Sequence, residues 1–333
     1  MRNLSNIGVE FTNTNDYGRG EVQSYHCKPS PIFRTKAQQM DINGLKSEDR
    51  RNIIIDGDEF ESKFTIGFEI EKTRLHRGSV QEYPLFCGFE TDSSCGYEAV
   101  THVLPLVSKS MWRTKVFNMF AEAKYIIEDR YSPSDYSCGG HITIGVNGMS
   151  GVELMNRVRE NSGIIFSIFR KRLMNRYCNG NVIMSEDSTS FGEKYVVAKP
   201  NSNSLEFRIP SRVTSVKQLM RRYELMYVLL DFSINTPNAR KSVLYNRLKP
   251  IVASMYERDM DKVNKIMELA KHFDKFLKTK KVDQNTCGWL EGWWSRSRCR
   301  MGSKRSLYKR NYRPLLSQAH YVNEFMSKWQ GLV

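Results

Sequence analysis

Long apolar runs are missing from this 333-residue chain. No stretch approaches the roughly 18 consecutive apolar residues that a membrane-spanning helix needs. The first residues, MRNLSNIGVEFTNTND, also lack the apolar centre of a secretory signal. We therefore expect a soluble protein that is not exported and that works in the cytoplasm.

The cysteines have no regular spacing. The seven cysteines are an odd number and are scattered over the chain. Because the chain is not a small secreted one, this pattern favours free thiols in a reducing compartment over a framework of disulfides.

Acidic residues are outnumbered by basic ones. Lysine and arginine total 51 against 36 aspartates and glutamates, which gives a net charge of +15. This imbalance favours anionic partners such as nucleotides, nucleic acids or acidic peptides. From Gly292 to Arg313 the chain contains no acid at all and interleaves arginine and lysine with tryptophan and tyrosine.

The basic aromatic segment at residues 289–313 has two interpretations. Arginine and lysine can contact phosphates while aromatic rings stack on bases, which predicts a nucleic-acid or acidic partner. Alternatively, the aromatic rings pack back on the domain and only the charged groups face water. Oligomeric state is not predicted by either interpretation.

The chain divides into three predicted regions. Residues 1–60 are polar and weakly periodic, which predicts an extended N-terminal arm. Residues 61–249 intersperse strand and helix patterns, and residues 250–333 are helical and basic. Because the strand patterns are short and alternate in polarity, they favour an antiparallel α+β fold over a buried parallel sheet.

Several local patterns predict individual elements. Regular structure is expected to begin at Phe64, where FTIGFEIEK alternates as a strand does. Ser150 and Ser215 each precede a Glu or Gln by three residues, the spacing of a helix capping box. The further predicted strands lie at 97–103, 138–145, 194–198 and 204–209, and the predicted helices at 105–129, 150–177, from 215 onward and at 260–277.

Two carboxylates stand out on the first predicted strand. Glu69 and Glu71 are two residues apart, so both side chains point to one face, roughly 6.5–7 Å apart along the strand. Adjacent carboxylates on a face repel each other unless a cation lies between them or one takes a proton. A pair of solvated glutamates remains the alternative interpretation.

Three further motifs also carry side chains that can bind a metal ion or a phosphate. LEFRIP places Glu206 and Arg208 on one strand face, where they can form an ion pair or hold a metal ion beside a phosphate. CGGHITIG places two glycines before His141, and such glycines let the backbone pass close to a ligand. In TDSSCGYEAV, Glu98 begins an apolar run after a turn.

In this order, the motifs FEIE, DSSCGYEAV, CGGHITIG and LEFRIP resemble the glutamine-synthetase-like carboxylate–amine ligases. The resemblance points to the amidoligase branch, which is related to glutamate–cysteine ligases and is often found in bacterial and phage genomes. It covers residues 64–211, less than half of the chain. It implies an antiparallel sheet with helices packed on one side, followed by a helical basic extension.

The resemblance also implies roles for individual residues. It implies that Arg208 and Glu71 are catalytic and that ATP and Mg²⁺ are the cofactors. It implies metal ligands at Glu69, Glu71, Glu98, His141 and Glu206. It implies nucleotide or substrate contacts at His141, Arg208, Lys199 and Arg176, with Lys194 as a weaker candidate.

The implied reaction joins a carboxylate, from an amino acid, peptide or protein, to an amine through an acyl phosphate that ATP supplies. Relatives often carry a second histidine where this chain has Thr143, and Ser-Pro where it has Thr101 and His102. The alternative is therefore a nucleic-acid-binding or structural accessory protein on an inactive ligase-like fold.

Overall fold

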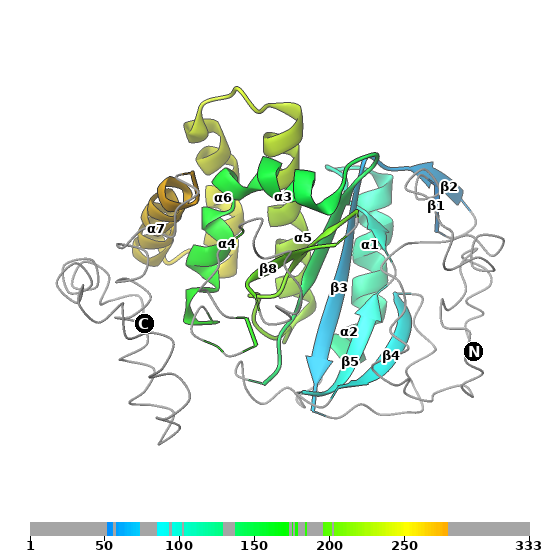
Figure 1. The fold of residues 1–333 in the computed structure, drawn as a ribbon. Helices are drawn as coiled ribbons and strands as arrows, with labels where there is room; N and C mark the ends of the chain where they lie inside the picture. Colours follow the sequence, from blue (N-terminus) through cyan, green and yellow to red (C-terminus); the bar gives the residue numbers. More distant parts are fainter. Residues whose placement is uncertain are drawn as a thin grey trace, which may run out of the picture.

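The computed structural model of this chain describes residues 52–55, 58–73, 85–92, 95–101, 103–128, 137–172, 175, 177–178, 184, 196–201 and 203–278. These residues form an antiparallel sheet with helices beside it (Figure 1). None of the helices in these ranges is long and apolar enough to cross a membrane. Arg176, Lys194, His102 and the basic segment at 289–313 lie outside the described residues.

The main sheet has seven strands, in the order β4-β5-β3-β7-β9-β8, with β6 also paired to β3. Every pairing in it is antiparallel, as expected from the short alternating strand patterns. The strands are β3 (Phe64–Lys72), β4 (Phe86–Asp92), β5 (Gly96–Thr101), β6 (Leu104–Pro105), β7 (Ile142–Val146), β8 (Ala198–Pro200) and β9 (Leu205–Phe207).

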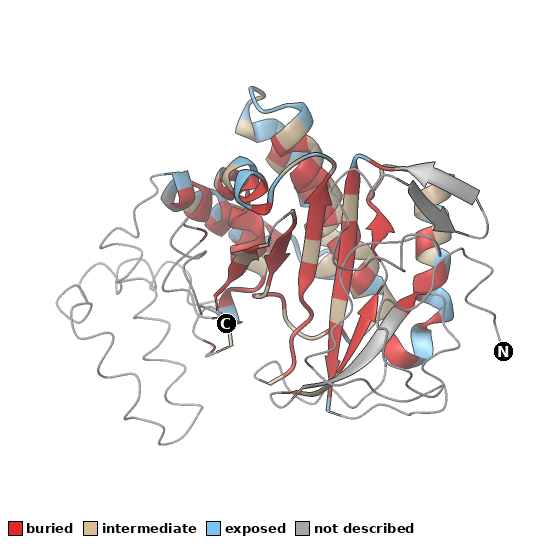
Figure 2. Ribbon diagram, turned by 45° about the vertical axis from the view of Figure 1, so that its right-hand side comes forward, coloured by how far each residue is buried: buried red, intermediate tan, exposed pale blue. Residues whose placement is uncertain are grey.

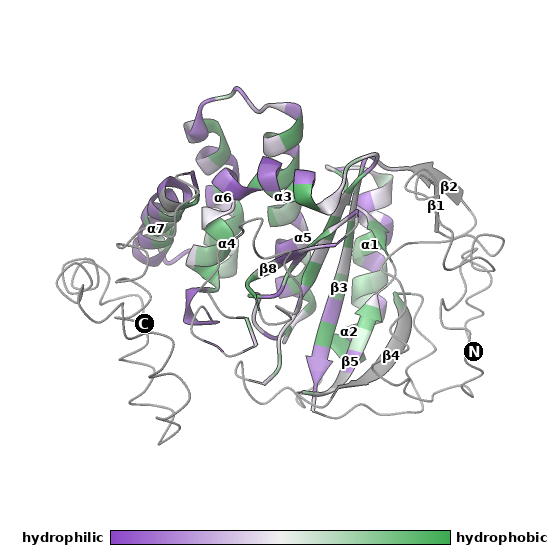
Figure 3. Cartoon of the chain, viewed as in Figure 1, coloured by the Kyte–Doolittle hydropathy of each residue, from purple (hydrophilic) through white to green (hydrophobic). Residues whose placement is uncertain are grey.

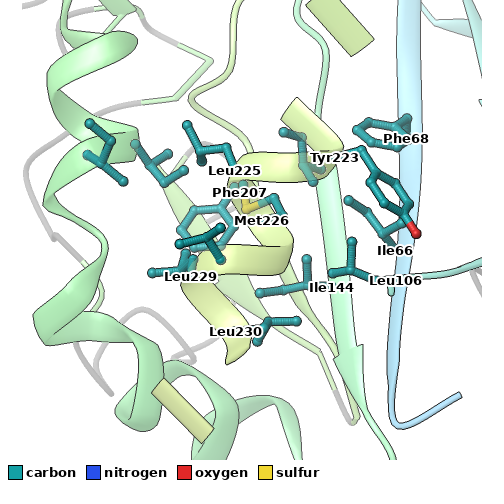
Figure 4. Packing of buried hydrophobic residues seen from close by; sticks show 14 of the residues in the cluster. Ile66, Phe68, Leu106, Ile144, Phe207, Tyr223, Leu225, Met226, Leu229 and Leu230 are labelled. Atoms are coloured by element: carbon teal, nitrogen blue, oxygen red, sulfur yellow. The ribbon is translucent and has the colours of Figure 1, made fainter. Parts of the chain in front are cut away.

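One face of this sheet is apolar and carries the core. The even-numbered residues of β3, including Ile66 and Phe68, are buried on this face. Helix α5 (Val216–Leu230) packs on it with Tyr223, Met226 and Leu229 (Figure 4). The ring of Phe68 also meets that of Phe120 from α1 (Met111–Glu122) edge to face, with centroids 5.8 Å apart. Burial is continuous from the strands into these helices (Figure 2).

The remaining helices extend the helical layer away from the sheet. They are α2 (Lys124–Ile127), α3 (Gly151–Val158), η6 (Arg159–Asn161), α4 (Gly163–Ile168), η7 (Arg170–Arg172), a π-helical turn η9 (Asp231–Asn235), α6 (Lys241–Met255) and α7 (Met260–Lys278). Helix α7 presents mainly hydrophilic residues in the view of Figure 3, while its Val263, Ile266 and Phe273 are buried.

Helix α7 is fastened to α4 by a buried carboxylate. Asp274 Oδ1 accepts a hydrogen bond from the Gly163 backbone N–H at 2.7 Å, and Asp274 Oδ2 accepts one from the Tyr245 hydroxyl at 2.6 Å. The Lys241 ammonium lies 3.5 Å from Oδ2. Residues 260–278 therefore pack on the helices of the preceding region, and the boundary expected after residue 249 falls inside α6.

The serine half of each predicted capping box is present. The Ser150 hydroxyl accepts a hydrogen bond from the Glu153 N–H at 3.2 Å, and the Ser215 hydroxyl accepts one from the Gln218 N–H at 3.1 Å. Because each side chain satisfies a backbone donor that has no partner within the helix, α3 and α5 begin where the sequence indicates.

Three predicted boundaries were wrong. Regular structure is already present before Phe64, because Asn52–Ile55 and Asp58–Glu61 pair as a hairpin, β1–β2. The helix expected from Pro105 begins at Met111, because Leu104–Pro105 joins the sheet and Ser110 supplies the cap.

The third wrong prediction is the single helix expected over residues 150–177. It is broken after Val158, where the Ser162 hydroxyl bonds back to the Val158 carbonyl at 2.9 Å. The chain restarts at Gly163, whose backbone packs so closely on Ala270 that an added Cβ would lie 2.2 Å from the Ala270 carbonyl oxygen. The close approach of α7 thus interrupts a segment whose local sequence predicts one continuous helix.

We predict that Asp274→Ala lowers the free energy of unfolding by about 3 kcal/mol, because the substitution leaves buried N–H and O–H donors without an acceptor. Chemical denaturation of the full chain measures this. Glu268→Ala on the same helix is the matched control, since its ion pair with Lys271 is about half exposed and should contribute under about 0.5 kcal/mol. Equal losses in the two variants would contradict the anchoring role.

Candidate functional site

The second face of the sheet is polar, and its centre is β3. Glu69 and Glu71 are odd-numbered residues of this strand and point away from the apolar face that Phe68 and Ile70 share. Strand β5 pairs with β3 so that Glu98 lies directly opposite Glu71. Three of the predicted ligands therefore belong to one pair of neighbouring strands.

His141 joins this face from the other side of β3. Its backbone continues the β3–β7 pairing, since the Glu69 N–H donates to the His141 carbonyl at 3.1 Å. The ring atom Nδ1 lies 2.8 Å from Glu69 Oε2, and Nε2 lies 3.2 Å from Glu71 Oε1. The imidazole thus bridges the two carboxylates of β3.

Strand β9 brings the fourth acid and its arginine. Thr143 of β7 pairs in register with Glu206, which places Glu206 on the polar face. Glu206 Oε1 lies 3.5 Å from His141 Nδ1 and also accepts a hydrogen bond from Arg208 Nη1. Arg208 Nε is buried and has no hydrogen-bond partner. The arginine therefore has a donor left over beside the acids.

The donor atoms form two groups. Glu69, His141 and Glu206 each offer one ligand atom, and these atoms lie within 4.8 Å of one another. Within the same limit, Glu71 and Glu98 are grouped with Cys95. Both groups have the size and composition of a site for a divalent cation.

All four carboxylates are withdrawn from solvent. Glu71 is 5% exposed, Glu98 3% and Glu206 8%, and the side chain of Glu69 is 14% exposed. The alternative of solvated glutamates on a wet strand face does not hold for them. Burying carboxylates is costly unless hydrogen bonds or a cation compensate the charge.

The charges in this cluster shift two pKa values. Burial and the Arg208 guanidinium lower the pKa of His141, but the neighbouring Glu71 and Glu69 outweigh them and hold it above its ordinary value of 6.5. Burial also lowers the pKa of Arg208, yet the four carboxylates together raise it above its usual value. The electrostatic potential at the site is therefore negative.

The paired glycines of CGGHITIG serve close packing of the backbone. The Gly139 N–H donates to Glu71 Oε2 and so fixes that carboxylate. At Gly140, an added Cβ would lie 2.7 Å from the Ser211 carbonyl oxygen and 2.6 Å from Arg222 Nη1. A side chain at that position would push β7 away from the segment after β9 and open the cluster.

The structure brings together most of the residues predicted from the four motifs. Those that meet are Glu69, Glu71, Glu98, His141, Glu206 and Arg208. Lys199 of β8 lies opposite Glu206 in register, on the same face and half-buried. Arg176 is outside the described residues, so its predicted contact stays a prediction.

Sequence reasoning missed two residues at the site. Cys95 lies inside the DSSCGYEAV motif, three residues before Glu98, but the scattered spacing of the cysteines gives no signal that its thiol belongs to the site. Arg172 is also buried, and its Nη1 donates to the Cys138 carbonyl at 2.9 Å, next to Gly139. No spacing pattern indicates Arg172, because it comes from a 3₁₀ turn remote in sequence.

We predict that His141 makes metal-free stability depend on pH. The folded protein binds this proton more tightly than the unfolded chain, so the contribution is fully present below about pH 6.5 and is lost as the pH rises through the raised pKa. The unfolding free energy of the wild type minus that of His141→Gln should therefore shrink with rising pH. Denaturation in a chelator between about pH 5.5 and 9 measures it, and a constant difference would contradict the shift.

A scan against protein-family models, a search of curated proteins and a search of solved structures each found no match to this chain. The resemblance carried by the four motifs therefore stays a prediction. The function is argued below from the geometry of the cluster.

Proposed function

We propose that this chain is an ATP- and Mg²⁺-dependent carboxylate–amine ligase with a glutamine-synthetase-like sheet. One observation carries the proposal. Residues taken from four separate motifs, and predicted to be ligands of metal and phosphate, lie in one buried cluster on one face of the sheet. Buried ionic groups often stabilise a fold no more than apolar residues of similar volume, which favours a binding role for this cluster.

The first donor group fits the proposed cation. Mg²⁺ prefers oxygen ligands, and Glu69 and Glu206 both supply carboxylate oxygens close to His141 Nδ1. The ring is held from its other nitrogen by Glu71, as metal-binding histidines usually are by a carboxylate. The second group contains a thiol, which Mg²⁺ does not favour.

Arg208 fits a phosphate beside that cation. Its Nη1 already donates to Glu206, while its buried Nε still lacks an acceptor. A phosphate oxygen would satisfy this donor, and the always-charged guanidinium would offset the charge of a transferring phosphoryl group. Lys199, opposite Glu206, is a second cation on the same face.

These residues suit a reaction in which charge must be neutralised. Glu69, His141 and Glu206 would hold Mg²⁺, whose positive charge would favour phosphoryl transfer from ATP to a carboxylate. The acids are largely buried and the side chain of Arg208 is only 14% exposed. This limits water at the site, which would strengthen each electrostatic contact and protect an acyl phosphate from hydrolysis. An amine would then displace the phosphate and form the amide.

We predict that Mg-ATP raises the melting temperature of the wild type and leaves Glu71→Gln and Glu206→Gln unchanged. Ligand at about 100 times its Kd adds about 2.7 kcal/mol of stability. Thermal unfolding is measured with Mg²⁺ alone, with ATP in a chelator and with both. Glu153→Gln is the matched control, because Glu153 is exposed on α3 and lies outside the cluster.

If the melting temperature of every variant, wild type included, is the same in all three conditions, the result would contradict the nucleotide site. A non-catalytic accessory role would then remain. If the shift is present, hydroxylamine as the amine tests the chemistry. ATP-dependent hydroxamate formation from a panel of amino acids, peptides and cell-wall fragments identifies the activated carboxylate. A shift without any ADP release would indicate nucleotide binding on an inactive ligase-like fold.

A further inference from the structure

Cys95 lies at the centre of the second donor group. Its Sγ and carboxylate oxygens of Glu71 and Glu98 lie within 4.8 Å of one another. All three residues are nine-tenths buried or more, with Cys95 and Glu98 each 3% exposed. Two carboxylates and a thiol of this kind make up a mixed oxygen and sulfur donor set.

The backbone holds this thiol in place. Cys95 immediately precedes β5, and the next residue, Gly96, has a φ of +108° that only glycine adopts without strain. A Cβ at Gly96 would lie 2.7 Å from the Thr73 carbonyl oxygen, so the turn is closed tightly against the end of β3. The Cys95 side chain is thereby fixed next to the β3–β5 pair that carries Glu71 and Glu98.

A separate observation favours a cation at this position. Glu71 and Glu98 are like charges directly opposite each other on neighbouring strands, an arrangement that destabilises a sheet. The negative potential that raises the pKa of Arg208 includes contributions from both Glu71 and Glu98. A divalent cation between the two strands would offset this repulsion.

The thiol decides which cation fits. A thiolate is a soft ligand that selects metals such as Zn²⁺, whereas Mg²⁺ is bound by oxygen. Zn²⁺ accepts cysteine sulfur and carboxylate oxygen together, in sites with three protein ligands and a position left open. The neighbouring group of Glu69, His141 and Glu206 contains no sulfur. The two groups therefore differ in the metal they prefer.

We propose that Glu71, Cys95 and Glu98 form a second cation site that selects a thiophilic divalent metal such as Zn²⁺ over Mg²⁺. On binding, the Cys95 S–H bond breaks, a sulfur–metal bond forms and the proton passes to solvent. No electron is transferred. The inference rests on the metal-binding part of the proposed function and is independent of its nucleotide part.

Cobalt(II) is the probe, because it occupies zinc sites and shows a sulfur-to-cobalt charge-transfer absorption in the near ultraviolet when a thiolate coordinates it. The full-length chain, stripped of metal by a chelator, is titrated with Co²⁺ in excess Mg²⁺. We expect a charge-transfer band in the wild type that Cys95→Ser loses and Cys138→Ser keeps. Cys138 is the matched control, since it is equally buried but belongs to neither donor group.

Zinc affinity gives a second readout that does not need a substrate. Competition with a chromophoric chelator should show zinc binding weakened at least about tenfold in both Cys95→Ser and Glu98→Gln. Glu98→Gln leaves the thiol intact, so it tests the site even if the cysteine variant folds poorly. Circular dichroism melts of the metal-free variants distinguish lost ligation from lost folding.

The outcomes separate this inference from the proposed function. Cobalt binding without a charge-transfer band, or a band that persists in Cys95→Ser, overturns the role of Cys95 and leaves the first metal group standing. Absence of any bound Co²⁺ overturns both. A band lost in Cys95→Ser, in a protein that ignores Mg-ATP, supports the thiolate site and contradicts the ligase.

Discussion

The antiparallel register of β3 with its neighbours determines both the core and the candidate site. Because side chains alternate along a strand, one register places Ile66 and Phe68 against α5 and places Glu69 and Glu71 on the opposite face. A shift of a single residue would exchange these faces and bury the acids in the apolar core. The packing of α5 on the strand therefore also fixes the direction of the carboxylates.

The cost of holding four buried carboxylates together is distributed over several elements. His141 bridges Glu69 and Glu71, and Arg208 compensates Glu206. The Gly139 N–H stabilises Glu71 from the backbone. The negative potential that remains would attract a divalent cation, and Arg208 would bind a phosphate beside it. Electrostatic repulsion of this kind is typical of functional sites, where local stability is lower than it could be because the residues are arranged for binding.

Separate parts of the chain support the site and the body of the fold. The acids lie on the sheet, which β7 and β9 extend by backbone pairing. Helix α7 is anchored elsewhere, through Asp274 and the contact of Phe166 with Phe273. These contacts therefore stabilise α4 and α7 without involving any residue of the cluster.

Sequence alone determined the elements whose signals are local. The alternation of FTIGFEIEK predicts β3 and the shared face of Glu69 and Glu71, because the period of a strand is two. Capping serines predict the starts of α3 and α5, because the hydrogen bond from the backbone N–H to the serine hydroxyl joins residues only three positions apart. The four motifs, taken in order, indicate ligand-type residues but contain no distances.

Only the tertiary structure decided which of these residues meet. The β3–β5 register places Glu98 opposite Glu71, and the β7–β9 register brings Glu206 to His141, across separations that no local pattern encodes. The break after Val158 arises because α7 packs on Gly163 more than one hundred residues away. Cys95 became a ligand candidate for the same reason. Its chemistry depends on neighbours brought together by strand pairing rather than on its place in the sequence.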